Sequence, residues 1–523
     1  MSTPTTPSYE SVAIHPLVAG APNKDFPQHA GKRVLVIYTG GTIGSKPKDP
    51  DPDSPQVVTR WEELAEKTPE IGRLQFPVDC IALVKPLDSC NVGPAEWARM
   101  AQIIQEHYEN YQGFVVLHGT DTMSNTASAL AFMLVGLSKP VVLTGAQISA
   151  MVSVRNDATQ NIIGALMLAN PAATGIPVIP EVCVYFGGRI LRGCRTNKDH
   201  TASFTPFDSP NMNWLGELGQ KINVDTDRVL KKPETSFGPR LKMEPRVVPI
   251  DVSPGIQDTT VLQEILKLKD IKAVILRAYG TGDLPTKPEF MRALKEARDE
   301  GKVVAVVTQC PHGPVELGIY DTSAQLVEAG LVAAYDITPQ AAHTKLMHLL
   351  GMSDLDQEEV EERFQRSLVG EQSRSIWLTK LPGKGKVIAG GETLPNPTSV
   401  HRIKGKEMRG TWKNTKIVTA SLRLKNATFT CSESHVEEIR LWVLPNWDEG
   451  LPLTGAHAVV RRSVPKQGEE PKPGLAILDV TNIVRPIAQP NSNISFTIAP
   501  MTPGAEVAWD GAELALVIDE TVA

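Results

Sequence analysis

The stretch RVLVIYTGGTIG, residues 33–44, joins a run of apolar residues to a glycine-rich turn. Its first half is apolar at successive positions, which is typical of a central parallel strand covered by helices on both faces. The glycine pair that follows places the hydroxyl of Thr42 where such a strand would end. TGGT can therefore present a reactive hydroxyl, cradle a phosphate or simply turn the chain.

Further runs of the same kind follow along the chain, and amphipathic stretches separate them. Residues 94–111 and 124–137 carry apolar side chains at helical spacing. Alternation of such helices with doubly buried strands predicts an α/β chain of βαβ units. The additional predicted strands are GFVVLHG (113–119), KPVVLTG (139–145), EVCVYFG (181–187), KAVILRAYG (272–280) and KVVAVVTQ (302–309).

The 523 residues are too many for one hydrophobic core, so we expect several domains. A Pro- and Lys-rich segment of weak periodicity between about 205 and 260 predicts a linker. After about residue 375, glycine and proline separate short alternating runs, which favours a β-sandwich. The predicted division is an N-terminal arm (1–31), a parallel-sheet α/β domain (32–225), a smaller α/β domain (245–373) and an all-β sandwich module (376–523).

Composition narrows the classes of partner and the compartment. The formal net charge is -6, with 53 Lys and Arg against 59 Asp and Glu, so we expect neither a nucleic-acid nor a membrane partner. The six cysteines show no C-x-x-C spacing, which argues against a disulfide framework and a zinc site and suits a reducing compartment. Residues 1–32 lack the pattern of a secretory signal. These features predict a cytoplasmic protein.

Four predicted strand ends are polar and contain glycine. They are YTGGTIG, LHGTDTMSNT, LTGAQ and AYGTGDLP. In open parallel sheets, ligands bind beyond the carboxyl ends of strands. TGGTIG lacks the spacing of the dinucleotide-binding G-x-G-x-x-G motif and the Gly-Lys-Ser/Thr ending of a P-loop. The pair of strand-end threonines, Thr42 and Thr120, together with Asp121, therefore favours a catalytic interpretation.

The two threonine motifs occur together with several others in one order. YTGGTIG is followed by PLDSCN, HGTDTM, KPVVLTGAQ, RILRGCRTNK and ILRAYGTGDLP. Over roughly residues 32–373 this chain resembles the type I (cytoplasmic) L-asparaginases. The resemblance implies a Rossmann- or flavodoxin-like first domain, hydrolysis of L-asparagine to L-aspartate and ammonia, and assembly as a homodimer or homotetramer. It implies neither a metal nor a cofactor.

The resemblance also implies roles for individual residues. Thr42 matches the nucleophile, Thr120 and Asp121 match the second Thr–Asp pair, and Lys198 completes a Thr–Asp–Lys group. Ser89, Gly119, Asp121 and Ala146 match substrate-binding positions, and Ala146 contributes through its backbone to oxyanion stabilisation.

This assignment agrees with the chemistry of a hydroxyl nucleophile. A threonine hydroxyl is weakly nucleophilic at neutral pH and needs a neighbouring base. Lys198 can act through a lowered pKa or orient Thr120 within a proton relay. Asp121 can hold the lysine, bind the α-ammonium of the substrate, or do both. The sequence does not choose between these alternatives.

Some positions depart from the family pattern. Many relatives carry a tyrosine in the loop after TGGT, whereas SKPKDPDPDSPQVV has none, so Tyr320 is our candidate for that role. Asn91 and Asp283 stand where Asp and Asn are usual, which bears on substrate affinity and on activity towards glutamine. Arg277 matches an effector-linked position, but we expect a structural arginine there. His118 is likewise expected to be structural, and His343 and His348 to be core or capping histidines.

The C-terminal module falls outside the resemblance. Trp412, Trp442, Trp447 and Trp509 are concentrated there and fit either a small core or a surface that binds carbohydrate or protein. Three alternative functions remain for the whole chain. They are the asparaginase-like subunit of a tRNA-dependent amidotransferase, a lysophospholipase-type esterase, and a binding protein without turnover.

Overall fold

A computed structural model describes most of the first 381 residues and several shorter stretches after them. The predicted N-terminal arm lies outside the described residues except at residues 15–16, and so does Tyr320. The described ranges are 15–16, 33–49, 54–74, 76–258, 260–317, 321–381, 385–388, 401–407, 416–431, 439–445, 457–460, 474–480, 484, 493–500 and 505–519.

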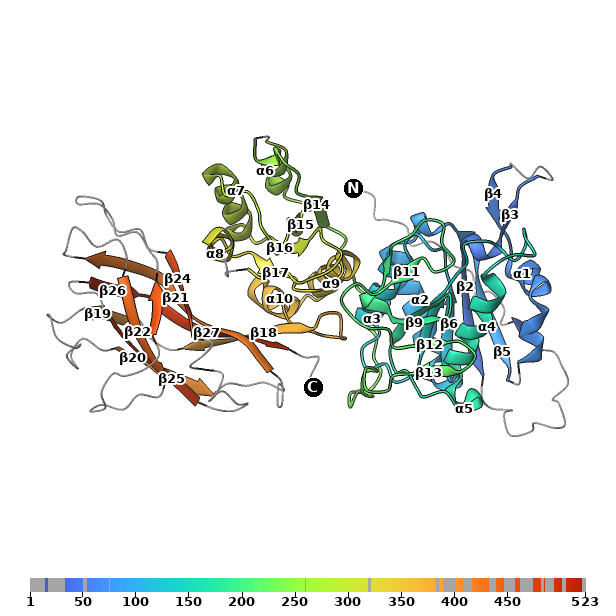
Figure 1. Cartoon of the computed structure of the whole chain (residues 1–523). Helices are drawn as coiled ribbons and strands as arrows, with labels where there is room; N and C mark the ends of the chain where they lie inside the picture. Colours follow the sequence, from blue (N-terminus) through green and yellow to red (C-terminus); the bar gives the residue numbers. More distant parts are fainter. Residues whose placement is uncertain are drawn as a thin grey trace.

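The first unit is built on a large sheet with a parallel centre (Figure 1). Its five central strands run parallel, and the flanking strands are antiparallel to their neighbours. In spatial order the strands are β1 (His15–Pro16), β5 (Val78–Leu87), β2 (Val34–Gly40), β6 (Gly113–Leu117), β7 (Val141–Thr144), β8 (Val182–Phe186), β9 (Arg189–Arg192), β12 (Gly216–Leu218) and β13 (Ile222–Val224).

Helices cover both faces of this sheet, as the doubly apolar strands predict. Along β2, Leu35 and Ile37 belong to one buried cluster with α2 and α3, whereas Val34 and Val36 belong to another with α1 and α4. This alternation follows from the two-residue repeat of a strand. The helices are α1 (Trp61–Lys67), α2 (Pro94–His107), α3 (Met123–Met133), α4 (Ala158–Ala169) and α5 (Pro171–Thr174).

Two short ribbons and several 3₁₀ turns complete the first unit. The ribbons pair β3 (Ser45–Pro47) with β4 (Gln56–Val58) and β10 (Asn197–Lys198) with β11 (Phe207–Asp208), and the turns used below are η2 (Thr42–Gly44), η4 (Ser89–Asn91) and η6 (Gly193–Arg195).

Residues 225–246 contain no helix or strand and lead into a second, smaller parallel sheet. Its strands, in spatial order, are β14 (Val247–Asp251), β15 (Ala273–Ala278), β16 (Val303–Thr308) and β17 (Val332–Ala333). Its helices are α6 (Val261–Lys267), α7 (Pro288–Asp299), α8 (Asp321–Glu328), α9 (Pro339–Gly351) and α10 (Gln357–Phe364).

The two α/β units share hydrophobic core. Leu130 and Met133 of α3 lie in one buried cluster with Leu346 and Met347 of α9. Helices α3 and α9 face each other between the units in Figure 1. Because this cluster is continuous with the core of both sheets, the two units pack against each other through buried apolar side chains.

The described residues of the C-terminal region form β-strands, as the alternating pattern predicts. Ile376 of β18 and Ala515 of β27 lie in a buried cluster with the second α/β unit. The pairing order is β18-β27-β21-β26-β19, with β24 beside β21, and β20-β25-β22-β23. That these strands make a sandwich stays a prediction. Their bounds are β18 (Arg374–Leu381), β19 (Gly385–Ile388), β20 (His401–Glu407), β21 (Lys416–Cys431), β22 (Ile439–Pro445), β23 (His457–Val460), β24 (Gly474–Asp479), β25 (Asn493–Pro500), β26 (Ala505–Trp509) and β27 (Gly511–Asp519).

The α/β fold class is confirmed, and all six predicted parallel runs are strands. The sequence reading nevertheless missed β5, which pairs directly with β2. Within VDCIALVKPL the polar residues Asp79 and Lys85 interrupt the apolar run, so it lacks the doubly buried signature. Among the described residues, no helix is long and apolar enough to cross a bilayer.

Candidate active site

The order of the central strands decides where a ligand site can form. Numbered along the chain, the parallel strands β5-β2-β6-β7-β8 have the order 2-1-3-4-5. In such sheets the order reverses between the first and third strands, and the crevice at their carboxyl ends is the usual ligand site. Here these strands are β2 and β6, and the segments that leave them carry Thr42 and Thr120.

Glycines bring these two segments into close contact. Gly41 has a φ of +84°, and a β-carbon at this position would lie 2.4 Å from the α-carbon of Gly119. A β-carbon at Gly119 would in turn lie 2.7 Å from the Ser89 Oγ. Side chains at the two glycines would therefore push the backbones apart. The structure thus brings the segments TGGT, HGTD and PLDS together at the carboxyl edge of the sheet.

Lys198 joins this group from a distant part of the chain. Its Nζ donates to the Thr120 Oγ1 at 2.9 Å and to the Asp121 Oδ1 at 2.7 Å. Thr120 is buried, whereas the Asp121 side chain is 67% exposed. Lys198 lies in the β10–β11 ribbon, where it pairs with Phe207. The three residues therefore form one hydrogen-bonded cluster with a cation between a hydroxyl and a carboxylate.

Thr42 is exposed at the start of η2, while its neighbours are anchored. Ile43 is buried, and its carbonyl accepts a hydrogen bond from Ser149 Oγ at 3.2 Å. The Ser45 hydroxyl donates to the Gly41 carbonyl at 3.1 Å. A fixed backbone thus presents the Thr42 hydroxyl at the edge of the sheet, where an incoming carbonyl can reach it.

Ser89 has the feature expected of a ligand-binding hydroxyl. It is 1% exposed, and its Oγ has no hydrogen-bond partner among the described residues. A buried polar group left without a partner costs about 1–3 kcal/mol. The η4 turn that holds it is fixed by Thr122, whose hydroxyl donates to the Ser89 carbonyl at 2.7 Å. The Ser89 hydroxyl is therefore held in place and free to bond to a ligand.

Ala146 follows β7 and is buried at the same edge. A β-carbon at the preceding Gly145 would lie 2.4 Å from the His118 carbonyl oxygen, so the β7 end lies against the HGTD segment. The backbone of residues 147–148 is held by Asp157, whose carboxylate accepts from the amides of Gln147 and Ile148. All the predicted substrate-binding positions thus lie on adjoining strand ends.

A buried hydrogen-bond chain supports the HGTD segment. The carbonyl of Gly119 can only accept, so the His118 Nδ1, 2.7 Å away, carries the proton. The His118 Nε2 then accepts from the Thr126 hydroxyl at 3.0 Å, which accepts from Trp97 Nε1 at 2.9 Å. Burial lowers the pKa of His118 to about 4, so the ring is neutral at pH 7. This is the structural role expected for His118, although no sequence pattern indicates its partners Thr126 and Trp97.

Other candidates lie apart from this cluster. Arg277 forms an ion pair with Asp251 at 2.9 Å on the second sheet, a structural contact. His343 Nε2 lies 3.2 Å from the Val247 carbonyl, and burial lowers its pKa. Within the described ranges, no three His, Cys, Asp or Glu side chains are grouped as metal ligands. Tyr320 lies outside the described residues, so its placement stays a prediction.

Comparison with known proteins identifies the family of this chain. Residues 33–230 match the model of the N-terminal asparaginase domain, and residues 246–364 match that of the glutaminase/asparaginase C-terminal domain. L-asparaginase 1 of Escherichia coli is 38% identical over 346 residues, which cover 65% of this chain and 98% of that protein. The chain belongs to the asparaginase family.

Two further relatives match the same part of the chain to different extents. The structure of L-asparaginase I from Vibrio cholerae has a TM-score of 0.59 and 36% identity, covering 66% of this chain and 99% of that one. The 60 kDa lysophospholipase of Mus musculus is 33% identical over 365 residues, 65% of this chain and 63% of that protein. The second matching family model ends at residue 364, so the C-terminal strands of this asparaginase-family chain lie outside both models.

Proposed function

We propose that this chain is an L-asparagine amidohydrolase that converts L-asparagine and water to L-aspartate and ammonia. The observation that carries the proposal is the Thr120–Asp121–Lys198 cluster, which lies beside the exposed Thr42 at the switch point of the first sheet. Family membership supports the reaction class.

The reaction begins with attack of the Thr42 Oγ1 on the side-chain amide carbon of asparagine. The carbon–nitrogen bond breaks, ammonia leaves with the proton of the Thr42 hydroxyl, and a β-aspartyl ester remains on Thr42. Water then adds to the ester carbonyl and releases aspartate, which restores the hydroxyl. A nucleophile of this kind splits one difficult hydrolysis into two easier steps.

The proton transfers are assigned to Thr120 and Lys198. The Lys198 Nζ donates to the Thr120 Oγ1 at 2.9 Å, so a proton can be exchanged between these two groups during the reaction. Tyr320, which lies outside the described residues, is proposed as a second group beside the nucleophile. Its replacement by phenylalanine should slow turnover.

The remaining residues are assigned to substrate recognition. The unpartnered Ser89 hydroxyl is suited to bond with the substrate carboxylate. The exposed Asp121 carboxylate is suited to the α-ammonium group, since a single ion pair with Lys198 leaves acceptor capacity on its oxygens. Backbone groups at Gly119 and Ala146 are proposed to contact the substrate and the developing oxyanion. We further propose assembly as a homodimer or homotetramer, as in the family.

The test is ammonia release from L-asparagine and from L-glutamine by the purified chain, with fatty-acid release from lysophosphatidylcholine measured as the alternative activity. Thr42→Ala should lower kcat by roughly 10³-fold or more, because no nucleophile remains. Thr174→Ala is the matched control, since that residue ends α5, at the amino edge of the sheet. No turnover of either amide by the wild-type chain would overturn the proposal.

A further inference from the structure

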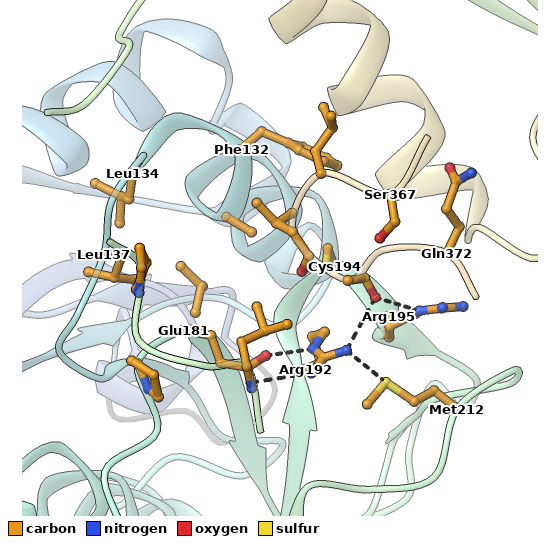
Figure 2. A pocket seen from close by; sticks show the side chains of 18 of the residues that line it. Phe132, Leu134, Leu137, Glu181, Arg192, Cys194, Arg195, Met212, Ser367 and Gln372 are labelled. Carbon is orange, nitrogen blue, oxygen red and sulfur yellow. Dashed lines mark hydrogen bonds and ion pairs between the residues drawn. The ribbon is translucent and has the colours of Figure 1, made fainter. Parts of the chain in front are cut away.

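A large cleft lies between the two α/β units, away from the candidate active site. Its volume is about 1120 Å³. The end of α3, the start of β8 and the η6 turn line one side, and the end of α9 with residues 367–373 lines the other. In Figure 2, Leu134 and Leu137 stand on the left of the cleft, whereas Arg195 and Gln372 stand on the right.

The cleft opens at the amino edge of the first sheet. Strands β6 and β8 are both parallel to β7, so the start of β8 lies at the edge opposite to the end of β6. Helix α3 begins next to Thr120, and its last turn reaches the cleft. The length of the helix therefore separates Thr120 from the cleft by about 16 Å. The cleft is therefore separate from the Thr42 and Thr120 site.

Two buried polar atoms on its lining have no partner among the described residues. They are the Ser209 Oγ and the His348 Nδ1. Ser209 is 8% exposed and His348 is 3% exposed. Nearly all buried polar groups in native proteins are hydrogen-bonded, so each of these atoms can bond to water or to a ligand that enters the cleft.

The charges around the cleft are strongly unequal. Six arginine and lysine side chains and two carboxylates line it. Arg192 and Arg195 are committed to Glu181 and Asp336, at 2.6 Å and 2.8 Å. Figure 2 shows the first of these pairs, with Arg192 also contacting Met212.

Two other guanidinium groups of the cleft are not paired with a carboxylate in the described part of the chain. Among the described residues, Arg240 donates only to the sulfur of Met352, a weak acceptor, and Arg363 lies in the last turn of α10. Planar guanidinium groups bind carboxylate and phosphate groups in a two-pronged manner. Within the described residues, the cleft thus presents guanidinium groups without a carboxylate partner at its exposed part and unpartnered polar atoms deeper inside.

The same cleft has an apolar wall. Phe132 of α3 and Leu134 and Leu137, which follow this helix, line it together with Leu349 of α9 and the exposed Leu368. A small inorganic anion would leave this wall exposed to water. A ligand with an apolar body and one anionic head would cover the wall and meet the guanidinium groups.

We propose that the cleft between the two α/β units is a binding site for an organic anion with an apolar body, held at its head group by Arg240 and Arg363. The ligand contacts both units and is independent of the proposed asparagine chemistry.

The test uses octanoate and octyl phosphate as probes, with 1-octanol and acetate as controls. Titration calorimetry and thermal unfolding are measured on the full chain, on the double variant Arg240→Ala/Arg363→Ala, and on Arg292→Ala, an exposed arginine of α7 away from the cleft. We expect saturable binding of at least one octyl anion with a rise in Tm. The double variant should lose affinity at least 10-fold, whereas Arg292→Ala and Thr42→Ala should bind as the wild type does.

Binding of one octyl anion only would identify the head group that the site takes. Absence of saturable binding by both anions would overturn the proposal, and so would equal binding of 1-octanol or undiminished affinity in the double variant. Sedimentation velocity tests whether a second copy of the chain occupies the cleft instead of a small ligand. If the double variant dissociates an oligomer and neither anion binds the wild type, the cleft is an interface between copies of the chain and the proposal fails.

Discussion

Two ion pairs on one stretch of chain behave differently because of what surrounds them. Arg192 and Glu181 meet at 2.6 Å at the amino edge of the first sheet, with side chains 8% and 4% exposed. Six residues further on, Lys198 and Asp121 meet at 2.7 Å at the carboxyl edge, with side chains 18% and 67% exposed. The distances are nearly equal, so distance does not distinguish them.

The difference lies in the partners. The Glu181 carboxylate is saturated by Arg192 and by the Leu230 amide, and Arg192 also donates to the Arg228 carbonyl. These contacts of Glu181 and Arg192 all join parts of the folded chain to one another. Lys198 instead donates both to the Asp121 carboxylate and to the Thr120 hydroxyl. These groups lie at the carboxyl edge of the sheet, where Gly41 and Gly119 allow the backbones to approach closely. The Glu181–Arg192 pair therefore only joins parts of the fold, whereas in the proposed mechanism the cation shared with the Thr120 hydroxyl takes part in proton transfer.

The largest expected effect comes from the carboxyl edge. Lys198→Met should lower kcat/KM by about 10²- to 10⁴-fold, the usual range for loss of an acid–base group. Stability should change by at most about 1 kcal/mol, because Asp121 is largely exposed and such pairs contribute little. Steady-state kinetics and urea unfolding measure the two quantities, with the exposed Lys221→Met as control. A large loss of stability with activity retained would place Lys198 with Arg192 as a structural cation.

The amino edge should show the reverse. Glu181→Ala leaves the Arg192 charge buried without its carboxylate, which should cost about 3–5 kcal/mol of unfolding free energy. Activity per folded molecule should stay near the wild-type value. Glu217→Ala, on the exposed face of β12, is the control in the same urea titrations. The double variant Glu181→Leu/Arg192→Met should recover most of the loss, and failure to recover it would mean that the pair has a further partner that depends on its charge.

The two edges should be alike in acid. Each contains a buried neutral histidine, His118 and His348, and burial lowers the pKa of each to about 4. The unfolded chain binds these protons near pH 6.5, whereas the folded chain binds them only near pH 4. The unfolding free energy is therefore highest above pH 6.5 and decreases as the pH falls from 6.5 to 4. The loss should be on the order of 3 kcal/mol per histidine.

His118→Asn isolates the contribution of the carboxyl edge. Asparagine does not titrate in this range, so the variant should lose less stability between pH 7 and 5 than the wild type does. Chemical denaturation at a series of pH values gives the slopes, and His200→Asn, on an exposed loop, is the control. Equal slopes for the wild type and His118→Asn would show that His118 is already protonated in the folded chain at pH 5.

The sequence predicted the parts of the carboxyl edge that depend on local pattern. The apolar runs ending in TGGT and HGTD placed Thr42 and Thr120 at strand ends, because continuous apolar strands must lie inside a covered sheet. That both ends meet at the switch point required the strand order, and this depends on β5. Its polar Asp79 pairs with Arg33 and accepts from the Tyr111 hydroxyl, contacts that no local pattern reveals.

The amino edge was less accessible to sequence reasoning. The Glu181–Arg192 pair joins the start of one strand to the end of another, and its burial comes from Arg228 and Gly370, far apart in the chain. The cleft with Arg240 and Arg363 arises only from the packing of α3 against α9. Lys198 lies between these cases. Family resemblance singled it out, while the β10–β11 ribbon that carries it gave no signal in the sequence.

The most direct test of the central claim is to identify the residue that carries the acyl group. L-asparagine turnover is quenched in acid during the steady state, and the digested chain is mapped by mass spectrometry, with Thr42→Ala treated in parallel. We expect a β-aspartyl ester on the peptide that contains Thr42, and neither ester nor ammonia release with Thr42→Ala. An ester on Thr120, or turnover that survives in Thr42→Ala, would contradict the account.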